Sequence, residues 1–322
     1  MFLRRCGIVA GIAAVFAALP ASAQQYPSRT VRLVVPYAPG GTGDIVARVL
    51  ADRLGQALGQ SVVVENRPGA TGAIGTKAVA SAAPDGHTIL VGQTGEMAIN
   101  HHWNKGLGYD PIADFAPVAL ATVVPLALVA PGKASYSTVA EMLKMSHTRA
   151  LSFASAGAAT PGHLSGELLR LRTKSKMTHV PYNGAGPALN DILGGHVDMF
   201  FSGFPPTVPH VKAGTMKLLA VSTARRSSVA PDTPTVAEAS GIADFDIALW
   251  QGFFAPRGTP REIVGRLHAE INKLLTQPDV KAKLLAAGAD VRTISIEEFA
   301  TFAKAESTKF LRIIREGGLK PG

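Results

Sequence analysis

Short apolar runs alternate along the chain with segments in which apolar residues recur every three or four positions. The runs predict strands, and the wider spacing predicts helices. The first run, residues 30–36, precedes a helical pattern formed by Val46, Val49, Leu50, Leu54 and Leu58, and Asp44 stands where it could cap that helix. Further strands are expected at residues 61–65, 88–91, 151–154, 177–181, 197–202 and 217–222.

Helix starts are marked most clearly in the second half of the chain. The capping-box pattern, Ser or Thr followed three residues later by Glu, begins at Thr138, Thr235, Thr259 and Ser295. A further helix is expected from about residue 161 to 172. Strands separated by helices in this way predict βαβ units and a parallel sheet.

The expected architecture is an α/β fold of two lobes, because about 300 residues exceed the usual size of a single core. Two extended segments interrupted by proline, residues 123–131 and 250–256, are candidate crossovers between the lobes. They would divide the chain into a first domain of residues 24–125 plus 250–322 and a second of residues 126–249. Each lobe would be a mostly parallel sheet flanked by helices, with a cleft between the lobes.

The first 23 residues have the pattern of a secretory signal peptide. Arg4 and Arg5 precede an apolar stretch, residues 7–19, that is too short to span a bilayer. Residues 21–23, Ala-Ser-Ala, form a cleavage site, so we expect export to the periplasm and cleavage after Ala23. The alternative is an uncleaved membrane anchor.

Composition excludes several classes of protein. The chain of 322 residues is 47% hydrophobic and 17% charged, which excludes a disordered protein. Cleavage would remove its single cysteine, and with it any disulfide, thiol nucleophile or thiolate metal site. It would leave 30 basic and 23 acidic residues, a net charge of +7. The basic residues are scattered, so no nucleic acid partner is expected, but the positive bias favours small anions.

Three polar, glycine-bearing loops follow predicted strands, where open α/β sheets place their ligands. The first, residues 36–44, has the sequence Pro-Tyr-Ala-Pro-Gly-Gly-Thr-Gly-Asp and opens a helix. The second, residues 154–167, contains two hydroxyl residues before another helix, and His163 there could donate to a carboxylate or cap the helix. The third is residues 92–100. Glycine allows backbone N–H groups to approach a ligand, and helix N-termini favour anions.

Signatures of enzymes and metal sites are scarce. No Gly-x-Ser-x-Gly or His-Glu-x-x-His motif occurs, and the adjacent His101 and His102 make a poor metal pair. No cofactor, no metal and no catalytic residue is therefore expected. The alternative is a secreted hydrolase or lyase, in which Glu96 or His163 would have to serve as a base.

A series of short motifs resembles the substrate-binding receptors of tripartite tricarboxylate transporters, the Bug-type receptors. The motifs follow one another in order over most of the chain after residue 25. They occupy residues 26–41, 64–69, 83–88, 109–111, 114–117, 163–167, 179–184, 187–189, 193–195, 209–214 and 231–238.

The resemblance implies a periplasmic binding protein of the type II-like, two-lobed kind that closes on a small carboxylate or related organic solute. One wall of its site would hold Tyr37, Gly40, Gly41, Thr42 and Asp44. The other wall would hold Ser155, Gly157, Ala159, Thr160 and His163, while Thr94 and Glu96 would reach in from the third loop.

Two positions depart from the family pattern. Ser202 follows the apolar strand where the family often has an acidic or amide residue, so an amino acid ligand is less favoured. Glu96 stands where small polar residues are common, and it would either repel a second carboxylate or bind a donor on the ligand.

The resemblance also implies a membrane permease as partner and a monomeric receptor. A third possibility is a ligand sensor that signals to a membrane partner, which the sequence does not distinguish from transport.

Overall fold

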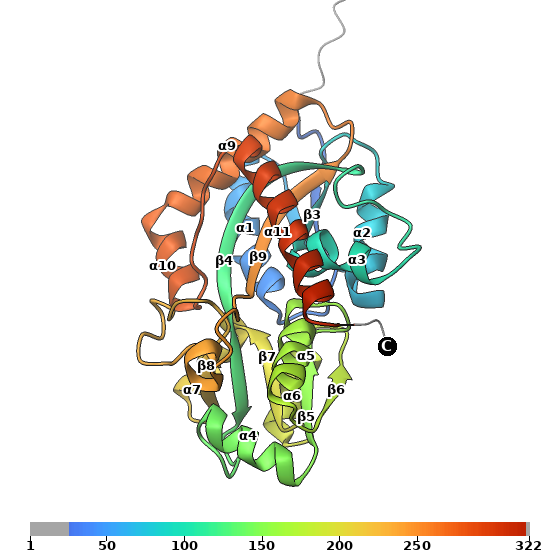
Figure 1. Cartoon of the computed structure of the whole chain (residues 1–322). Coiled ribbons are helices and arrows are strands. Elements are labelled where there is room, and N and C mark those ends of the chain that lie inside the picture. The colour runs from blue at the N-terminus through green and yellow to red at the C-terminus, as the bar shows by residue number, and fades with distance from the viewer. Residues whose placement is uncertain (1–25, 320–322) are drawn as a thin grey trace, which may run out of the picture.

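A single long strand, β4 (Phe115–Pro131), runs through both lobes of the molecule (Figure 1). In the computed structural model, which describes residues 26–319, its first part pairs antiparallel with β9 (Ala248–Pro256), as far as the pair Pro125 and Ala248. From Leu126 onward it pairs instead with β7 (Met199–Gly203) and, from Ala127, with β8 (Met216–Val221). The change of partner falls between residues 125 and 126, and the division of the chain into two domains there stays a prediction.

The strands follow the order β2-β1-β3-β9-β4-β7-β5-β6, and β8 pairs with β4. The upper lobe in Figure 1 contains the parallel pairs of β1 with β2 and β3, and the lower lobe those of β5 with β6 and β7. The expected α/β fold of two lobes is therefore present. Each lobe also contains antiparallel pairs, because β4 and β9, which join the lobes, run against their neighbours.

Most predicted strands are observed within one or two residues of their expected limits. The remaining strands are β1 (Val31–Val35), β2 (Val62–Asn66), β3 (Thr88–Gln93), β5 (Leu151–Ser155) and β6 (Met177–Pro181). The helices are α1 (Thr42–Leu58), η1 (Ala70–Gly72), α2 (Ala73–Ala80), η2 (Gly95–Ile99), α3 (Asn100–Trp103), α4 (Val139–Thr148), α5 (Pro161–Thr173), α6 (Ala185–Gly194), α7 (Phe204–Lys212), α8 (Val236–Ser240), α9 (Arg261–Thr276), α10 (Pro278–Ala286) and α11 (Ile296–Glu316).

The predicted helix starts are confirmed at three of four capping-box sequences. Thr235 and Ser295 form complete capping boxes, and Thr138 accepts a hydrogen bond from the N–H of Glu141. The prediction at Thr259 is wrong, since its hydroxyl donates to the Pro256 carbonyl at 2.8 Å and α9 starts two residues later.

The sequence pattern suggested that Asp44 caps the start of its helix, but it does not. Helix α1 starts two residues earlier, with Gly41 as its N-cap and no side-chain cap. The Asp44 carboxylate accepts instead from the N–H of Gly40 at 3.0 Å, so it braces the turn before the helix from within the first turn.

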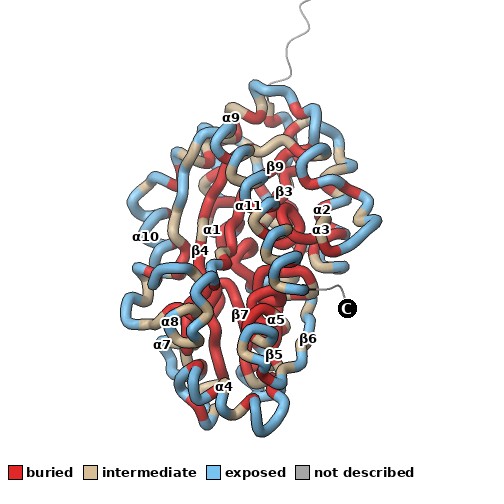
Figure 2. Tube along the Cα trace, viewed as in Figure 1, coloured by how far each residue is buried: buried red, intermediate tan, exposed pale blue. Residues whose placement is uncertain are grey.

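The core follows the strands, and the exposed residues lie on the outer helices and loops (Figure 2). Trp250, Phe253, Phe299 and Phe310 are fully buried in the upper lobe, and Phe153, Phe200 and Phe201 in the lower. Helix α11 turns Phe299, Phe310 and Ile314 inward, which secures the C-terminal segment to the first lobe. Within residues 26–319, no helix combines the length and apolar character that crossing a membrane would need.

Replacing Gly252 with alanine should destabilise the protein by about 1–3 kcal/mol, the usual result of overpacking a core. An ideal Cβ at Gly252 of β9 would lie 2.2 Å from Cζ of the fully buried Phe299. Denaturant unfolding should show this loss.

Gly265→Ala is the matched control. Gly265 lies inside α9, and an added Cβ there meets nothing within 4 Å. Alanine should stabilise that helix by about 0.5–1 kcal/mol. Equal effects of the two substitutions would contradict the packing of Phe299 on β9.

Candidate functional site

A pocket lies between the lobes where four helices begin. The space free of atoms is about 590 Å³ when the open solvent at its mouth is counted, and about 40 Å³ of it can hold the centre of a water-sized sphere in this closed form. Its walls include Gly41 to Asp44 at the start of α1, Thr160 to Gly162 at the start of α5, Ala185 at the start of α6, and Gly203, the N-cap of α7. The first N–H groups of a helix have no partner within it, and the helix dipole makes that end positive. The four dipole ends around one pocket favour a negatively charged ligand, and the free N–H groups come chiefly from α1 and α6, because the first turns of α5 and α7 contain prolines, which have no N–H.

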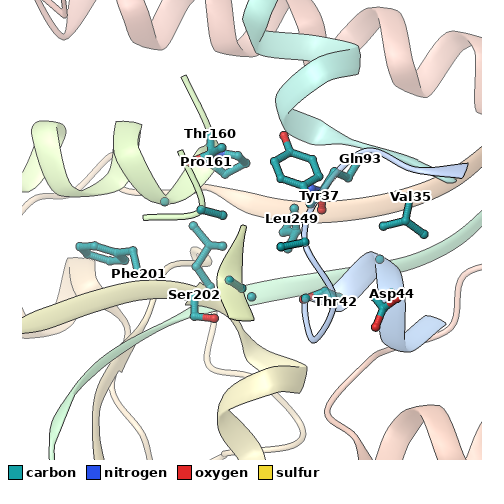
Figure 3. A pocket seen from close by; sticks show the side chains of 18 of the residues that line it. Val35, Tyr37, Thr42, Asp44, Gln93, Thr160, Pro161, Phe201, Ser202 and Leu249 are labelled. Carbon is teal, nitrogen blue, oxygen red and sulfur yellow. The ribbon is translucent and has the colours of Figure 1, made fainter. Parts of the chain in front are cut away.

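Two residues that line this pocket, one from each lobe, carry buried hydroxyl groups. Thr42 of the first lobe and Ser202 of the second are 3% and 2% exposed, and neither Oγ has a hydrogen-bond partner within the described structure (Figure 3). An ideal Cβ at Gly203 would lie 2.2 Å from Thr42 Oγ1, so the lobes touch at this point. A buried hydroxyl without a partner is costly, and acceptor oxygens on a ligand are the groups that would satisfy it.

Asp44 also lines the pocket, but its carboxylate is already occupied. It accepts from Gly40 N–H, from Arg48 Nε and from Asn66 Nδ2, all at about 3.0 Å. Burial alone would raise the pKa of Asp44, but these hydrogen bonds outweigh it and hold the pKa below its usual value. Asp44 therefore fixes the Gly40–Gly41 turn, so that the N–H groups of the first turn face the pocket.

Among the described residues that line the pocket, none is lysine, arginine or histidine. The rest of the lining is largely apolar. It includes Val35, Val91, Leu126, Phe200, Phe201 and Leu249. An anion here would be held by neutral donors, while its carbon skeleton contacts an apolar wall.

Tyr37 lines the pocket with its ring, and its hydroxyl points away from the cavity (Figure 3). The hydroxyl oxygen lies 3.0 Å from Glu96 Oε2 and 3.2 Å from the Thr71 carbonyl oxygen. Glu96 is fully buried, and its Oε1 accepts from Gln93 N–H at 2.6 Å. Burial raises the pKa of Glu96 to about 8, although these hydrogen bonds act in the opposite direction. Glu96 therefore lies behind the part of the pocket wall that the Tyr37 ring forms.

The second-lobe loop is held mainly by its own hydrogen bonds. Ser155 Oγ contacts the Gly157 carbonyl at 2.8 Å and His179 Nε2 at 2.7 Å. Thr160 caps α5 by accepting from the N–H of His163. The ring of His163 accepts through Nδ1 from Ala159 N–H at 3.1 Å, and burial lowers the pKa of His163 to about 4. His163 is therefore a neutral acceptor that shapes the loop.

Contacts between the lobes flank the pocket. The N–H of Ala38 donates to the Asn183 carbonyl at 3.1 Å, and Trp103 of the first lobe meets the His163 ring edge-on at 5.3 Å. The structure therefore has the lobes closed around the pocket.

The structure divides the predicted site residues into two groups. The pocket is lined by Tyr37, Gly41, Thr42, Asp44, Thr160 and Ser202. Gly40 is exposed in the turn before α1, and the remaining predicted residues are buried without lining the pocket: Thr94, Glu96, Ser155, Gly157, Ala159 and His163. Thr94 accepts through Oγ1 from the N–H of Trp250 at 2.9 Å, which ties the third loop to β9. Which of these residues touches a ligand stays a prediction.

Several lining residues were not among the predicted ones, including Gln93, Ala185 and Leu249. Ala185 carries a readable signal, because Gly184 directly precedes it at the start of a helix, as glycines do in the other loops. Gln93 and Leu249 reach the site through β3 and β9, whose pairing joins residues about 160 positions apart.

Two α/β lobes that close on a pocket at converging helix N-termini define the class of two-lobed periplasmic solute-binding proteins. The comparisons agree with this class. Residues 46–319 match the model of the tripartite tricarboxylate transporter family receptor. The chain is 35% identical over 314 residues to protein BugT of Bordetella pertussis, covering 97% of this chain and 94% of BugT.

Two solved structures have the same fold at similar identity. Rpa4515 of R. palustris, solved with adipate, superposes with a TM-score of 0.89 at 35% identity, covering 92% of this chain and 100% of that one. MatC of Rhodopseudomonas palustris, solved with bound malate, gives 0.84 at 36% identity, covering 90% and 100%. The chain belongs to the receptor family of tripartite tricarboxylate transporters, whose members are substrate-binding receptors and not enzymes.

The buried histidine His163 should make the protein less stable in acid. The pKa of His163 is about 4 in the folded protein, whereas an unperturbed histidine has a pKa of 6.5. The unfolded chain therefore binds the proton at a higher pH than the folded protein does. The free energy of unfolding should therefore drop by roughly 1 kcal/mol per pH unit between about 6.5 and 4 on account of this group. His163→Asn, which keeps an acceptor in place of Nδ1, should reduce that slope in urea titrations at each pH.

His147→Asn serves as the control, because His147 lies exposed on α4. It should leave the slope of the wild type unchanged. An identical slope for His163→Asn and the wild type would show that burial of His163 does not govern the acid sensitivity.

Proposed function

We propose that this protein is exported to the periplasm, with cleavage after Ala23, and captures a small organic carboxylate for a tripartite tricarboxylate-type permease. Residues 1–23 lie outside the described part of the chain, so the cleavage rests on the sequence pattern alone. The observation that carries the proposal is the pair of unpartnered hydroxyls, Thr42 and Ser202, among four helix N-termini.

Binding would work by closure of the lobes. Each lobe holds part of the site: Thr42 and the first turn of α1 on one side, Ser202 and the starts of α5, α6 and α7 on the other. A ligand that bonds to both sides stabilises the closed form relative to the open form. Hydrogen bonds to a charged group contribute about 1.5–3 kcal/mol each, and micromolar affinity needs about 8 kcal/mol. A handful of such bonds suffices once ordering costs are subtracted.

The lining narrows the ligand class. No cationic side chain is present among the described lining residues, so N–H and hydroxyl donors would bind the carboxylate. The apolar remainder fits a short carbon skeleton. A ligand ammonium group finds no free carboxylate, because that of Asp44 already accepts from three donors. The adipate and malate bound by the related receptors support a dicarboxylate of this kind.

A thermal-shift screen of monocarboxylates, dicarboxylates, aromatic acids and amino acids should find stabilisation among the carboxylates. A ligand at 100 times its Kd adds about 2.7 kcal/mol to the free energy of unfolding, which is readily measured. The amide of the best carboxylate is the control compound and should give little shift. No shift from any carboxylate would refute carboxylate capture.

Thr42→Val and Ser202→Ala should each weaken binding of the carboxylate found in this screen by about tenfold, because each removes one hydroxyl donor. Isothermal titration calorimetry measures the change in Kd. Ser165→Ala is the matched control: its hydroxyl on α5 is also buried without a partner, but it does not line the pocket. Unchanged affinity in both pocket variants would exclude these hydroxyls as ligand contacts.

A further inference from the structure

The protonation state of Glu96 decides where the single hydrogen of the Tyr37 hydroxyl is donated. The Tyr37 hydroxyl has one hydrogen, yet it lies within hydrogen-bond distance of two acceptors, Glu96 Oε2 at 3.0 Å and the Thr71 carbonyl at 3.2 Å. If the hydrogen points to Thr71, an ionised Glu96 would face the lone pairs of the tyrosine. If Glu96 is protonated, both contacts are hydrogen bonds, because Glu96 donates to Tyr37 and Tyr37 donates to the Thr71 carbonyl.

The surroundings of Glu96 favour the neutral acid. The side chain is fully buried, and the titratable groups that influence it directly are two tyrosines, Tyr37 and Tyr109. Helix α11 packs against the η2 segment, but its Glu306 and Lys309 form an ion pair with each other at 2.8 Å. On the neighbouring α3, His101 and His102 bond to Ser307 of α11 instead. An unpaired charge in such a site is strongly disfavoured.

The chain of contacts ends where the lobes meet. The Thr71 carbonyl also accepts from Asn100 Nδ2 at 2.9 Å. Thr71 has a positive φ of 54°, a conformation that is unfavourable for a non-glycine residue and that these contacts help to maintain. Its Cγ2 lies 3.2 Å from an ideal Cβ on Gly157, so Thr71 touches the loop of the second lobe. Glu96, Tyr37 and Thr71 therefore connect the pocket wall to the closing surface.

We propose that Glu96 is a positioning residue that works as a neutral carboxylic acid, holding the Tyr37 wall and the Thr71 contact in place for an anionic ligand. Its proton joins the pocket wall to the closing surface. Loss of that proton reverses the bond, so that Tyr37 donates to the Glu96 carboxylate and no longer to Thr71, and it places a negative charge directly behind the wall. The inference rests on the proposed capture of a carboxylate and names one residue that makes the site compatible with it.

Glu96→Gln and Glu96→Ala test the role of the neutral acid, with malate and adipate as probes in calorimetric titrations from pH 6 to 9.5. Glutamine keeps a neutral donor and acceptor, so at pH 7 its Kd should stay within about twofold of the wild type, whereas alanine should bind about tenfold more weakly or worse. The wild-type Kd should rise by about 30-fold from pH 7 to 9.5 as the neutral form is depopulated, and the Kd of Glu96→Gln should not. Glu262→Gln, an exposed change on α9, should follow the wild type.

The proposal is overturned if Glu96→Gln binds as weakly as Glu96→Ala at pH 7, or if the wild type and Glu96→Gln share one pH profile. A measurement without ligand keeps the result separate from the proposed function. A raised pKa means that the folded protein holds this proton while the unfolded chain releases it above pH 4.5, so stability falls as the pH rises towards 8. The difference in melting temperature between the wild type and Glu96→Gln should therefore change with pH, even if neither probe binds. A difference in melting temperature that stays constant with pH would refute the neutral state of Glu96, whether or not a ligand binds.

Discussion

Backbone N–H groups at the start of a helix have no partner within it, and this constraint decides where the protein can bind a solute. In each βα unit around the pocket the helix starts just after its strand ends, from β1 to α1, β5 to α5, β6 to α6 and β7 to α7. Parallel strands present those ends on one edge of the sheet, so their unsatisfied donors gather there. Closure brings the edges of the two lobes face to face. The topology itself therefore makes a pocket for an anion.

The pocket combines this positive potential with strict control of negative charge. Asp44 lies in its lining but is occupied by Gly40, Arg48 and Asn66, and Glu96 stands behind Tyr37 in a buried position where ionisation is disfavoured. A free carboxylate in either place would repel the ligand that the helix ends attract. Neutral donors have a further consequence: water can replace the ligand at the N–H and hydroxyl groups when the lobes open, with no cation left unpaired.

Local patterns predicted what depends on nearby residues. Apolar runs located the strands, and Thr235 and Ser295 marked their helix starts because capping involves residues only three positions apart. The three glycine-bearing loops were found for the same reason. The antiparallel pairing of β4 with β9 was not predicted, because it joins residues more than 120 positions apart. Nor does the sequence reveal that Tyr37 lines the pocket while His163 packs behind it, because packing decides which way each side chain turns.

Within residues 26–319 the chain passes between the lobes twice, at Pro125 and Leu126 within β4 and at Ala248, the first residue of β9. These two residues, Pro125 and Ala248, are paired with each other, so any opening movement must bend both passages together. The described contacts across the cleft are mostly neutral, such as Ala38 with Asn183 and Trp103 with His163. Neutral contacts of this size hold the closed form by only a few kcal/mol. The bonds that a ligand adds at Thr42 and Ser202 are of the same order, and they are therefore large enough to decide which form prevails.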